Sequence, residues 1–100
     1  MYLVATRIEY SRPVSQDMID KGKQEVLEPL RQQPGYYAYS TARIGERELL
    51  TVHLWDNQSA AERAIAALSA SLRAALAGDA DSPPTRSMGE VLLHHDVRRG

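Results

Sequence analysis

Three residues in the middle of the sequence have side chains that could take part in catalysis: Tyr39, His53 and Trp55. His53 titrates near neutrality, so it is the best candidate for an acid or a base in the chain. Tyr39 could donate a phenolic hydrogen bond to a substrate oxygen, and Trp55 could stack against a flat substrate. All three also have structural interpretations, because aromatic strand residues often anchor a core or an interface, and a histidine can serve only to bond the backbone.

Metal and cofactor chemistry have little support in the sequence. His94 and His95 look like a metal-binding pair, but neighbouring strand residues point to opposite faces of a sheet and cannot both reach one ion. Cysteine is absent, which excludes disulfides, thiolate metal sites and cysteine nucleophiles. Motifs of phosphate-binding loops, nucleophile elbows and zinc hydrolases are absent as well. We therefore expect neither a metal nor a cofactor.

The composition is that of an ordinary globular domain. The chain has 100 residues, of which 43% are hydrophobic and 25% charged, and its net charge is −1. This balance argues against a disordered or nucleic-acid-binding protein. No apolar stretch approaches the roughly 20 residues of a membrane span, and no charged segment precedes Tyr2 as in a signal peptide. We expect one cytoplasmic domain over residues 1–97, a frayed tail at 98–100, and no nucleic-acid or membrane partner.

Residue patterns predict the elements that must position these side chains. β-Branched and aromatic residues predict strands at residues 2–10, 36–43, 48–55 and 87–96. Apolar spacings of three, four and seven predict a helix that begins at the N-cap Ser15, with a bend or early end near Pro29. Ser59 and Glu62 form a capping box at the start of a second, alanine-rich helix. The order β-α-β-β-α-β predicts a ferredoxin-like α+β fold, in which two helices cover one face of a four-stranded antiparallel sheet.

Side-chain alternation then sorts the strand residues into a helix-covered face and an outer face. In the third strand we assign Leu50, Val52 and Leu54 to the helices, which turns His53 and Trp55 outward. In the first strand Val4 and Ile8 belong beneath the helices. The fourth strand is ambiguous, because Val91 and Leu93 alternate with the equally apolar Leu92. The predicted outer face contains Leu3, Arg7, Tyr37, Tyr39, Thr41, Leu49, Thr51, His53 and Trp55, joined by Leu92 and His94 or their neighbours.

Such an outer face would need a cover. Three large rings alone carry on the order of 450–750 Å² of surface, more than a monomer usually exposes in one patch. A second copy is the simplest cover, so the sequence predicts a homodimer formed through the sheet face. A small aromatic ligand would bind beside that face. Its predicted contacts are Arg7, Tyr37, Thr51, Leu92 and His94.

Several short segments resemble a known superfamily. They are the end of the first helix at residues 27–30, Pro34-Gly35-Tyr36 with Tyr39, and the run of residues 52–57 followed by 59–62. With the order of elements, they make residues 3 to about 96 resemble the dimeric α+β barrel superfamily, and within it the antibiotic biosynthesis monooxygenase (ABM) type.

The resemblance implies a cofactor-free oxygenase with Trp55 in place of the tryptophan that ends strand three in those enzymes. Thr51 stands where they have an asparagine, and Ala61 stands where they have a tyrosine. The haem-degrading branch uses a histidine of the second helix, which residues 59–77 lack, so haem degradation is disfavoured. The implied function is monooxygenation of a small aromatic or polyketide-like compound, with Trp55, Tyr39 and His53 as catalytic residues. The alternative is a non-catalytic dimeric module that binds a small ligand or a partner chain.

Overall fold

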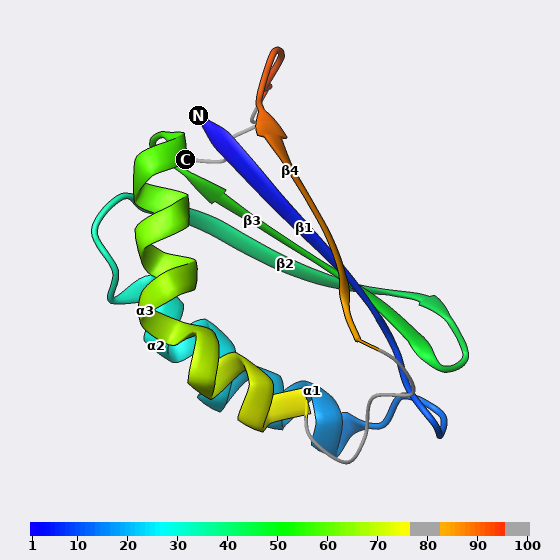
Figure 1. Cartoon of the computed structure of the whole chain (residues 1–100). Helices are drawn as coiled ribbons and strands as arrows, with labels where there is room; N and C mark the ends of the chain where they lie inside the picture. Colours follow the sequence, from blue (N-terminus) through cyan, green and yellow to red (C-terminus); the bar gives the residue numbers. More distant parts are fainter. Residues whose placement is uncertain (77–82, 96–100) are drawn as a thin grey trace, which may run out of the picture.

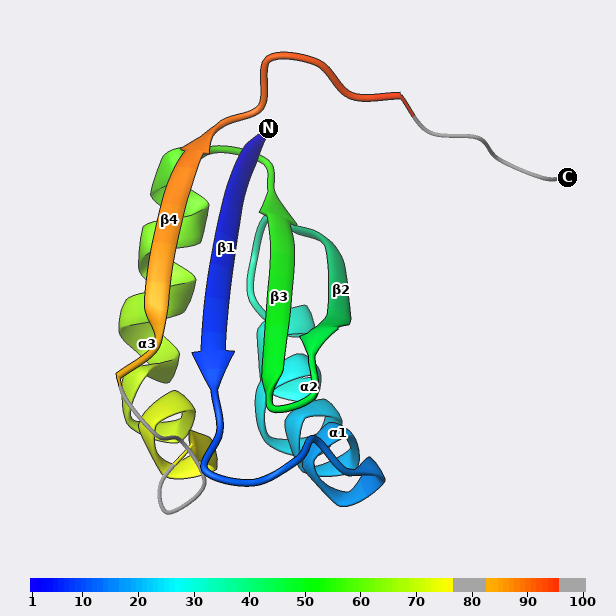
Figure 2. The same cartoon turned by 90° about the vertical axis from the view of Figure 1, so that its right-hand side faces the viewer.

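The structure is a computed structural model that describes residues 1–76 and 83–95 (Figure 1). Its sheet has the strand order β2-β3-β1-β4, every neighbouring pair is antiparallel, and the helices cover one face (Figure 2). This confirms the predicted ferredoxin-like fold; the predicted frayed tail lies outside the described residues. The elements are β1 (Tyr2–Glu9), α1 (Gln16–Gly22), the π-helical segment η1 (Lys23–Leu27), α2 (Glu28–Arg31), β2 (Tyr36–Gly45), β3 (Glu48–Trp55), α3 (Gln58–Leu76) and β4 (Thr85–Glu90).

The first helical region runs without interruption from α1 through η1 to α2. The Ser15 hydroxyl accepts a hydrogen bond from the Met18 amide at 3.4 Å, so the predicted N-cap is confirmed. A bend or early end was predicted near Pro29, and the helical region ends two residues after it, at Arg31. Just before Pro29 the helix widens into a π-helical turn, where the Glu28 amide reaches back to the Lys23 carbonyl. Because proline lacks an amide donor and crowds the preceding turn, a wider turn accommodates it without ending the helix.

The N-cap of helix α3 lies two residues before its predicted position. The Asn57 side-chain oxygen accepts a hydrogen bond from the Ala60 amide at 2.9 Å, so Asn57 takes the place predicted for Ser59. Gly35 packs directly against this turn with a φ of +87°. A Cβ atom there would lie 2.6 Å from the Ala60 Cβ atom, so only glycine allows the chain entering β2 to approach α3 so closely.

The face assigned to β3 is wrong. Leu49, Thr51, His53 and Trp55 are all buried beneath the helices, whereas Leu50, Val52 and Leu54 face outward. In the antiparallel register His53 lies opposite Val4, and Thr51 lies opposite Thr6, so each pair shares one face. The assignment of Val4 and Ile8 to the helix-covered face was correct. Alternation shows which residues share a face but not which face is covered, and here both sets are apolar enough to be inside.

The strand β2 changes parity at its start. A register irregularity between Tyr36 and Ala38 lets Tyr36 pair with Trp55 and Tyr39 pair with His53, so both tyrosines face the helices. Tyr37, which the bulge displaces, is 41% exposed. The outward placement predicted for Tyr39 and Thr41 is therefore wrong, and that of Tyr37 is correct.

The strand β4 ends earlier than predicted. It covers Thr85–Glu90, and Glu90 lies opposite Tyr2, where β1 begins. One further backbone hydrogen bond follows, from the Val91 amide to the Met1 carbonyl at 2.9 Å. The chain then leaves the sheet and runs away from the body of the domain (Figure 2). Leu92 and Leu93 are 90% and 91% exposed, so neither belongs to a sheet face.

The core has two parts at opposite ends of the covered face. One surrounds Trp55 and Val4 with Leu30 and alanines of α3, and the other joins Ile8 and Leu49 to residues of α1 and the loop before it. The middle of β3, at Thr51 and His53, lies between them. This leaves room over the centre of the sheet.

Candidate functional site

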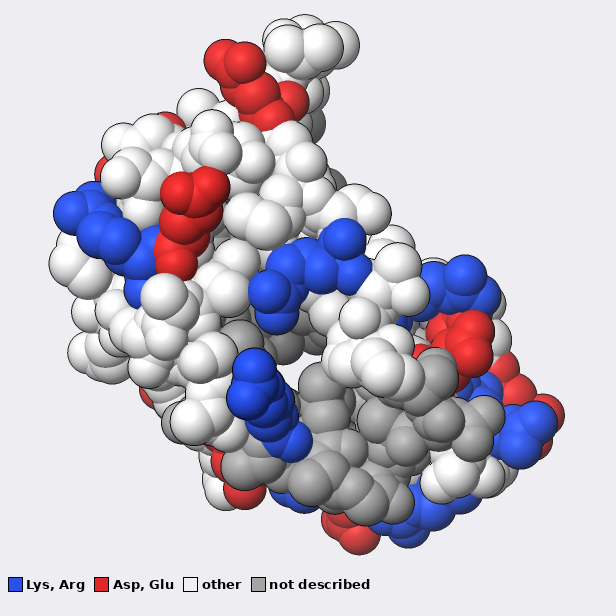
Figure 3. Space-filling view, in the orientation of Figure 1, with Lys and Arg blue, Asp and Glu red and all other residues white. Residues whose placement is uncertain are grey.

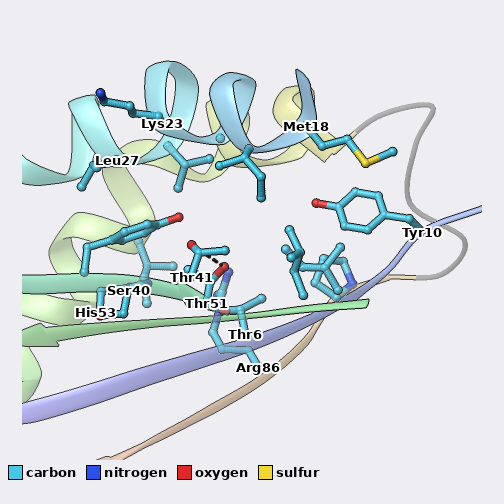
Figure 4. A pocket seen from close by; sticks show the side chains of 18 residues that line it. Thr6, Tyr10, Met18, Lys23, Leu27, Ser40, Thr41, Thr51, His53 and Arg86 are labelled. Carbon is cyan, nitrogen blue, oxygen red and sulfur yellow. Dashed lines mark hydrogen bonds between the residues drawn. The ribbon is translucent and has the colours of Figure 1, made fainter. Parts of the chain in front are cut away.

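A cavity of about 290 Å³ lies between the centre of the sheet and the helices (Figure 4). Its walls combine apolar side chains with hydroxyl, phenol, imidazole and guanidinium groups. They are Thr6, Ile8, Tyr10, Met18, Ile19, Gly22, Lys23, Val26, Leu27, Tyr39, Ser40, Thr41, Leu49, Thr51, His53, Ile65, Pro84 and Arg86. The volume suits a small molecule, and the mixture of an apolar surface with a few polar groups is typical of a ligand site.

The floor of the cavity is a polar row that crosses all strands of the sheet. Thr41 of β2 pairs with Thr51 of β3, Thr51 with Thr6 of β1, and Thr6 with Arg86 of β4. The Thr41 and Thr51 hydroxyl oxygens are 3.5 Å apart, and Arg86 reaches up beside them (Figure 4). The row therefore presents three hydroxyl groups to the cavity and has a cation, Arg86, at one end.

The charges around the cavity have one sign. Among the described lining residues only Lys23 and Arg86 are charged, and no carboxylate takes part. The amine of Lys23 points away from the sheet, which leaves Arg86 as the cation that faces the row (Figure 4). Basic side chains also flank the hollow between the sheet and the helices on the surface (Figure 3). Such a site favours a neutral or anionic ligand.

His53 and Trp55 form a hydrogen-bonded pair in the next row of the sheet. The Trp55 indole Nε1 donates to His53 Nδ1 at 2.6 Å, and the two rings meet edge to face with centroids 5.8 Å apart. Tyr36 packs against the other side of the indole, also edge to face at 5.8 Å. Burial raises the pKa of Tyr36. Trp55 is fully buried by these contacts and does not line the cavity.

His53 is a neutral side chain at neutral pH. Its burial lowers its pKa from 6.5 to about 4, and the positive charge of Arg86 contributes in the same direction. Tyr39 stacks beside it: the planes of the two rings differ by 13°, and the ring centroids are 6.2 Å apart. A histidine with so low a pKa is a weak base.

The structure brings together some of the predicted site residues and separates others. Tyr39, Thr51 and His53 line the cavity, and Trp55 supports His53 from behind. Arg7 lies on the outer face, where its guanidinium contacts Glu48 at 2.5 Å and Glu9 at 3.3 Å.

Tyr37, Leu92 and His94 also lie away from the cavity. Tyr37 meets His94 edge to face at 5.9 Å, and both are exposed, as is Leu92. These residues and Arg7 were predicted to bind ligand because the outer face was taken for the binding face. The inverted assignment of β3 explains why they were grouped with Thr51 and His53.

Other lining residues were missed by sequence reasoning. Thr6 alternates with Val4 and Ile8, so its parity placed it beneath the helices, but a single threonine gave no sign of a site. Arg86 lies just before the strand predicted at 87–96 and was missed because β4 begins earlier than its hydrophobic residues suggest. Tyr10 and Met18 close one end of the cavity (Figure 4). The described residues contain no cluster of metal-ligating side chains, and none of the described helices has the length and apolarity to span a bilayer.

Comparison with protein-family models gives no match, and comparison with curated sequences gives none either. Solved structures match closely in fold. SnoaB from Streptomyces nogalater, a cofactor-independent oxygenase, superposes with a TM-score of 0.76 at 12% identity over 93% of this chain and 94% of its own. ActVA-Orf6 from Streptomyces coelicolor, a monooxygenase in complex with nanaomycin D, gives 0.73 at 19% identity over 93% and 92%. NE2512 from Nitrosomonas europaea, of unknown function, gives 0.76 at 17% identity over 99% and 95%.

These structures and this chain share one fold. The resemblance stated from the sequence is confirmed at the level of the fold.

Proposed function

We propose that the protein is a cofactor-free monooxygenase-like enzyme that binds a small aromatic or polyketide-like compound in the cavity between sheet and helices. The observation that carries the proposal is the cavity itself, with apolar walls and the polar row Thr41-Thr51-Thr6-Arg86 on its floor. A flat ring system would lie against the apolar walls, and its oxygens would meet the row, His53 and Tyr39.

The chemistry follows from the substrate class. In an anthrone, a methylene group activated by its phenolic rings becomes a carbonyl, O₂ provides that oxygen atom, and its second atom leaves as water. The substrate provides all four electrons, so no other reductant is needed. The protein would supply a water-poor cavity and hydrogen bonds to the anion that forms when the substrate loses its proton. Arg86 and the hydroxyl row favour that anion.

A second function has a specific observation in its favour. The ABM oxygenases that the sequence resembles have an asparagine and a tyrosine where this chain has Thr51 and the fully buried Ala61. A non-catalytic module that binds a small ligand needs only the cavity. The two functions share the site and differ in turnover.

The proposal includes a homodimer formed through the outer face of the sheet. Leu3, Ala5, Leu50, Val52 and Leu54 make this face aliphatic, and no described element covers it (Figure 2). The exposed Leu92 and Leu93 extend the apolar surface that a second copy would cover. Apolar area of this kind is typical of an interface between subunits.

Oxygen uptake with hydroxylated anthrones and quinols tests the proposed activity. Gly22 offers a matched pair of variants, because it lines the cavity and a Cβ atom there meets nothing within 4 Å. It follows Met18 by four residues and precedes Val26 by four, so its side chain would share their cavity-facing side of the helix. Gly22→Leu should obstruct the cavity, whereas Gly22→Ala should leave it open, and both favour the helix.

We expect uptake and a quinone product with the wild type and Gly22→Ala, and loss of both with Gly22→Leu. Ligand binding without uptake, again lost only in Gly22→Leu, would support the non-catalytic module. Binding that Gly22→Leu leaves unchanged would contradict both functions.

A further inference from the structure

The bond between Trp55 and His53 constrains the protons of the histidine. An indole nitrogen carries a hydrogen and can only donate, so His53 Nδ1, 2.6 Å away, must accept and cannot carry a hydrogen. A neutral imidazole has one hydrogen on its two nitrogens, which places it on Nε2. In a protonated ring Nδ1 would also carry a hydrogen, so two donors, Nδ1 of His53 and Nε1 of Trp55, would face each other.

The second nitrogen of His53 faces the cavity. Nδ1 is occupied by Trp55, and Nε2 has no partner within the described chain. Among the described residues, every fully buried side-chain nitrogen or oxygen has a hydrogen-bond partner. Since Nε2 has none, it is not fully buried. Since only 6% of the residue is exposed and it lines the cavity, that access is through the cavity.

The surroundings of Nε2 present further donors. The neighbouring row ends in the Arg86 guanidinium, which is close enough to His53 to affect its charge. Tyr39 stacks beside the ring, and Tyr10 and Lys23 are the other titratable residues in the described lining. None of these side chains is an acid that could bind a cationic ligand.

We infer that Trp55 is a positioning residue that holds His53 as the tautomer with its hydrogen on Nε2, so that His53 and Arg86 together select ligands with an ionised phenol or enol oxygen. His53 is then a hydrogen-bond donor to that oxygen and not a base. The choice of an aromatic ligand rests on the proposed function; the tautomer does not. The low pKa of His53 supports this, because a ring that stays neutral keeps its hydrogen on Nε2 through the physiological range.

NMR of the protein labelled with ¹⁵N-histidine tests the tautomer without a ligand. Long-range ¹H–¹⁵N correlations distinguish a protonated from an unprotonated ring nitrogen, and at pH 7 we expect His53 to carry its hydrogen on Nε2. Trp55→Phe removes the donor and should give a mixture of tautomers. Where that variant does not fold, the wild-type spectrum still decides, because hydrogen on Nδ1 would overturn the inference.

Binding of two matched naphthoquinones tests the selection. 2-Hydroxy-1,4-naphthoquinone ionises at neutral pH, and its methyl ether has a similar shape but cannot. We expect the hydroxy compound to bind about tenfold more tightly, as a charge-assisted hydrogen bond allows. His53→Gln should keep much of this preference, because an amide can accept from Trp55 and donate to the ligand. His53→Phe and Arg86→Gln should each reduce it.

The outcomes separate the inference from the proposed function. Equal binding of the two compounds, or a preference that His53→Phe does not change, would overturn the selection of an anionic oxygen. Binding of neither compound would contradict the ligand class and the proposed function together, while the NMR spectrum would still confirm or overturn the role of Trp55.

Discussion

The two faces of β3 differ in what covers them. The inner face carries Thr51, His53 and Trp55, and the helices bury all of them. The outer face carries Leu50, Val52 and Leu54, which are half-buried and lie under no described element. Polar groups on the inner face line a cavity or have hydrogen-bond partners, whereas the outer face combines the aliphatic side chains of β3 with the exposed ion pairs of Arg7. This difference is the basis for proposing a ligand on the first face and a second copy of the chain on the other.

The largest difference between the faces should appear in stability. Trp55→Ala removes a fully buried ring from the centre of one core cluster, so we expect a loss of about 3–5 kcal/mol in the free energy of unfolding. Leu54→Ala, the neighbouring outer residue, should cost less than half of this. Urea denaturation at one protein concentration measures both. Equal losses would show that the outer face is packed as tightly as the inner one.

A pH-dependent loss of stability should follow from the burial of His53. Its pKa is about 4 in the folded chain and about 6.5 when unfolded, so folding favours the neutral form. Its contribution is complete above pH 6.5 and is lost as the pH falls towards 4, by about 3 kcal/mol. His53→Gln should remove this component. We would measure unfolding at pH 7 and pH 4 in both proteins, and equal pH dependence would contradict the burial.

The outer face should respond to charge through association. In a homodimer formed through this face, Val52→Lys would place a lysine from each copy in an apolar interface. We expect dimerisation to weaken about 100-fold or more, which corresponds to about 3 kcal/mol. Val52→Ile is the control. Light scattering after gel filtration measures the mass, and a wild-type chain that stays at 11.1 kDa at micromolar concentration would contradict the dimer.

The order of elements was predictable because it depends on local patterns. Strand β3 and the Ser15 cap were both predicted from neighbouring residues. The end of β4 was not, because it depends on the pairing with β1 and not on the apolar character of the residues after Glu90.

The site was predictable only in part, and one choice explains most of the difference. Tyr39, Thr51 and His53 were identified by residue type. The prediction that they share one face of the sheet was correct, although the face chosen was the wrong one. Which side the helices cover could have been found from the register, since Val4 was placed inside and lies opposite His53. Nothing in the sequence indicated the hydrogen bond from Trp55 to His53, except that the two residues are two positions apart and so share a face of the strand.

The smallest effect should come from an arginine on the wrong face for the ligand. Arg7 and Arg86 lie on neighbouring strands, but Arg7 contacts Glu48 and Glu9 on the outer face, whereas Arg86 faces the cavity. Hydrogen bonding to Glu48 raises the pKa of Arg7, yet the residue is exposed, and exposed ion pairs contribute little to stability. Arg7→Gln should leave both the unfolding midpoint and the affinity for 2-hydroxy-1,4-naphthoquinone unchanged within error. Arg86→Gln should weaken that affinity about fivefold. Calorimetric titration of both variants compares the two faces, and a weaker affinity in Arg7→Gln alone would mean that the ligand binds outside the cavity.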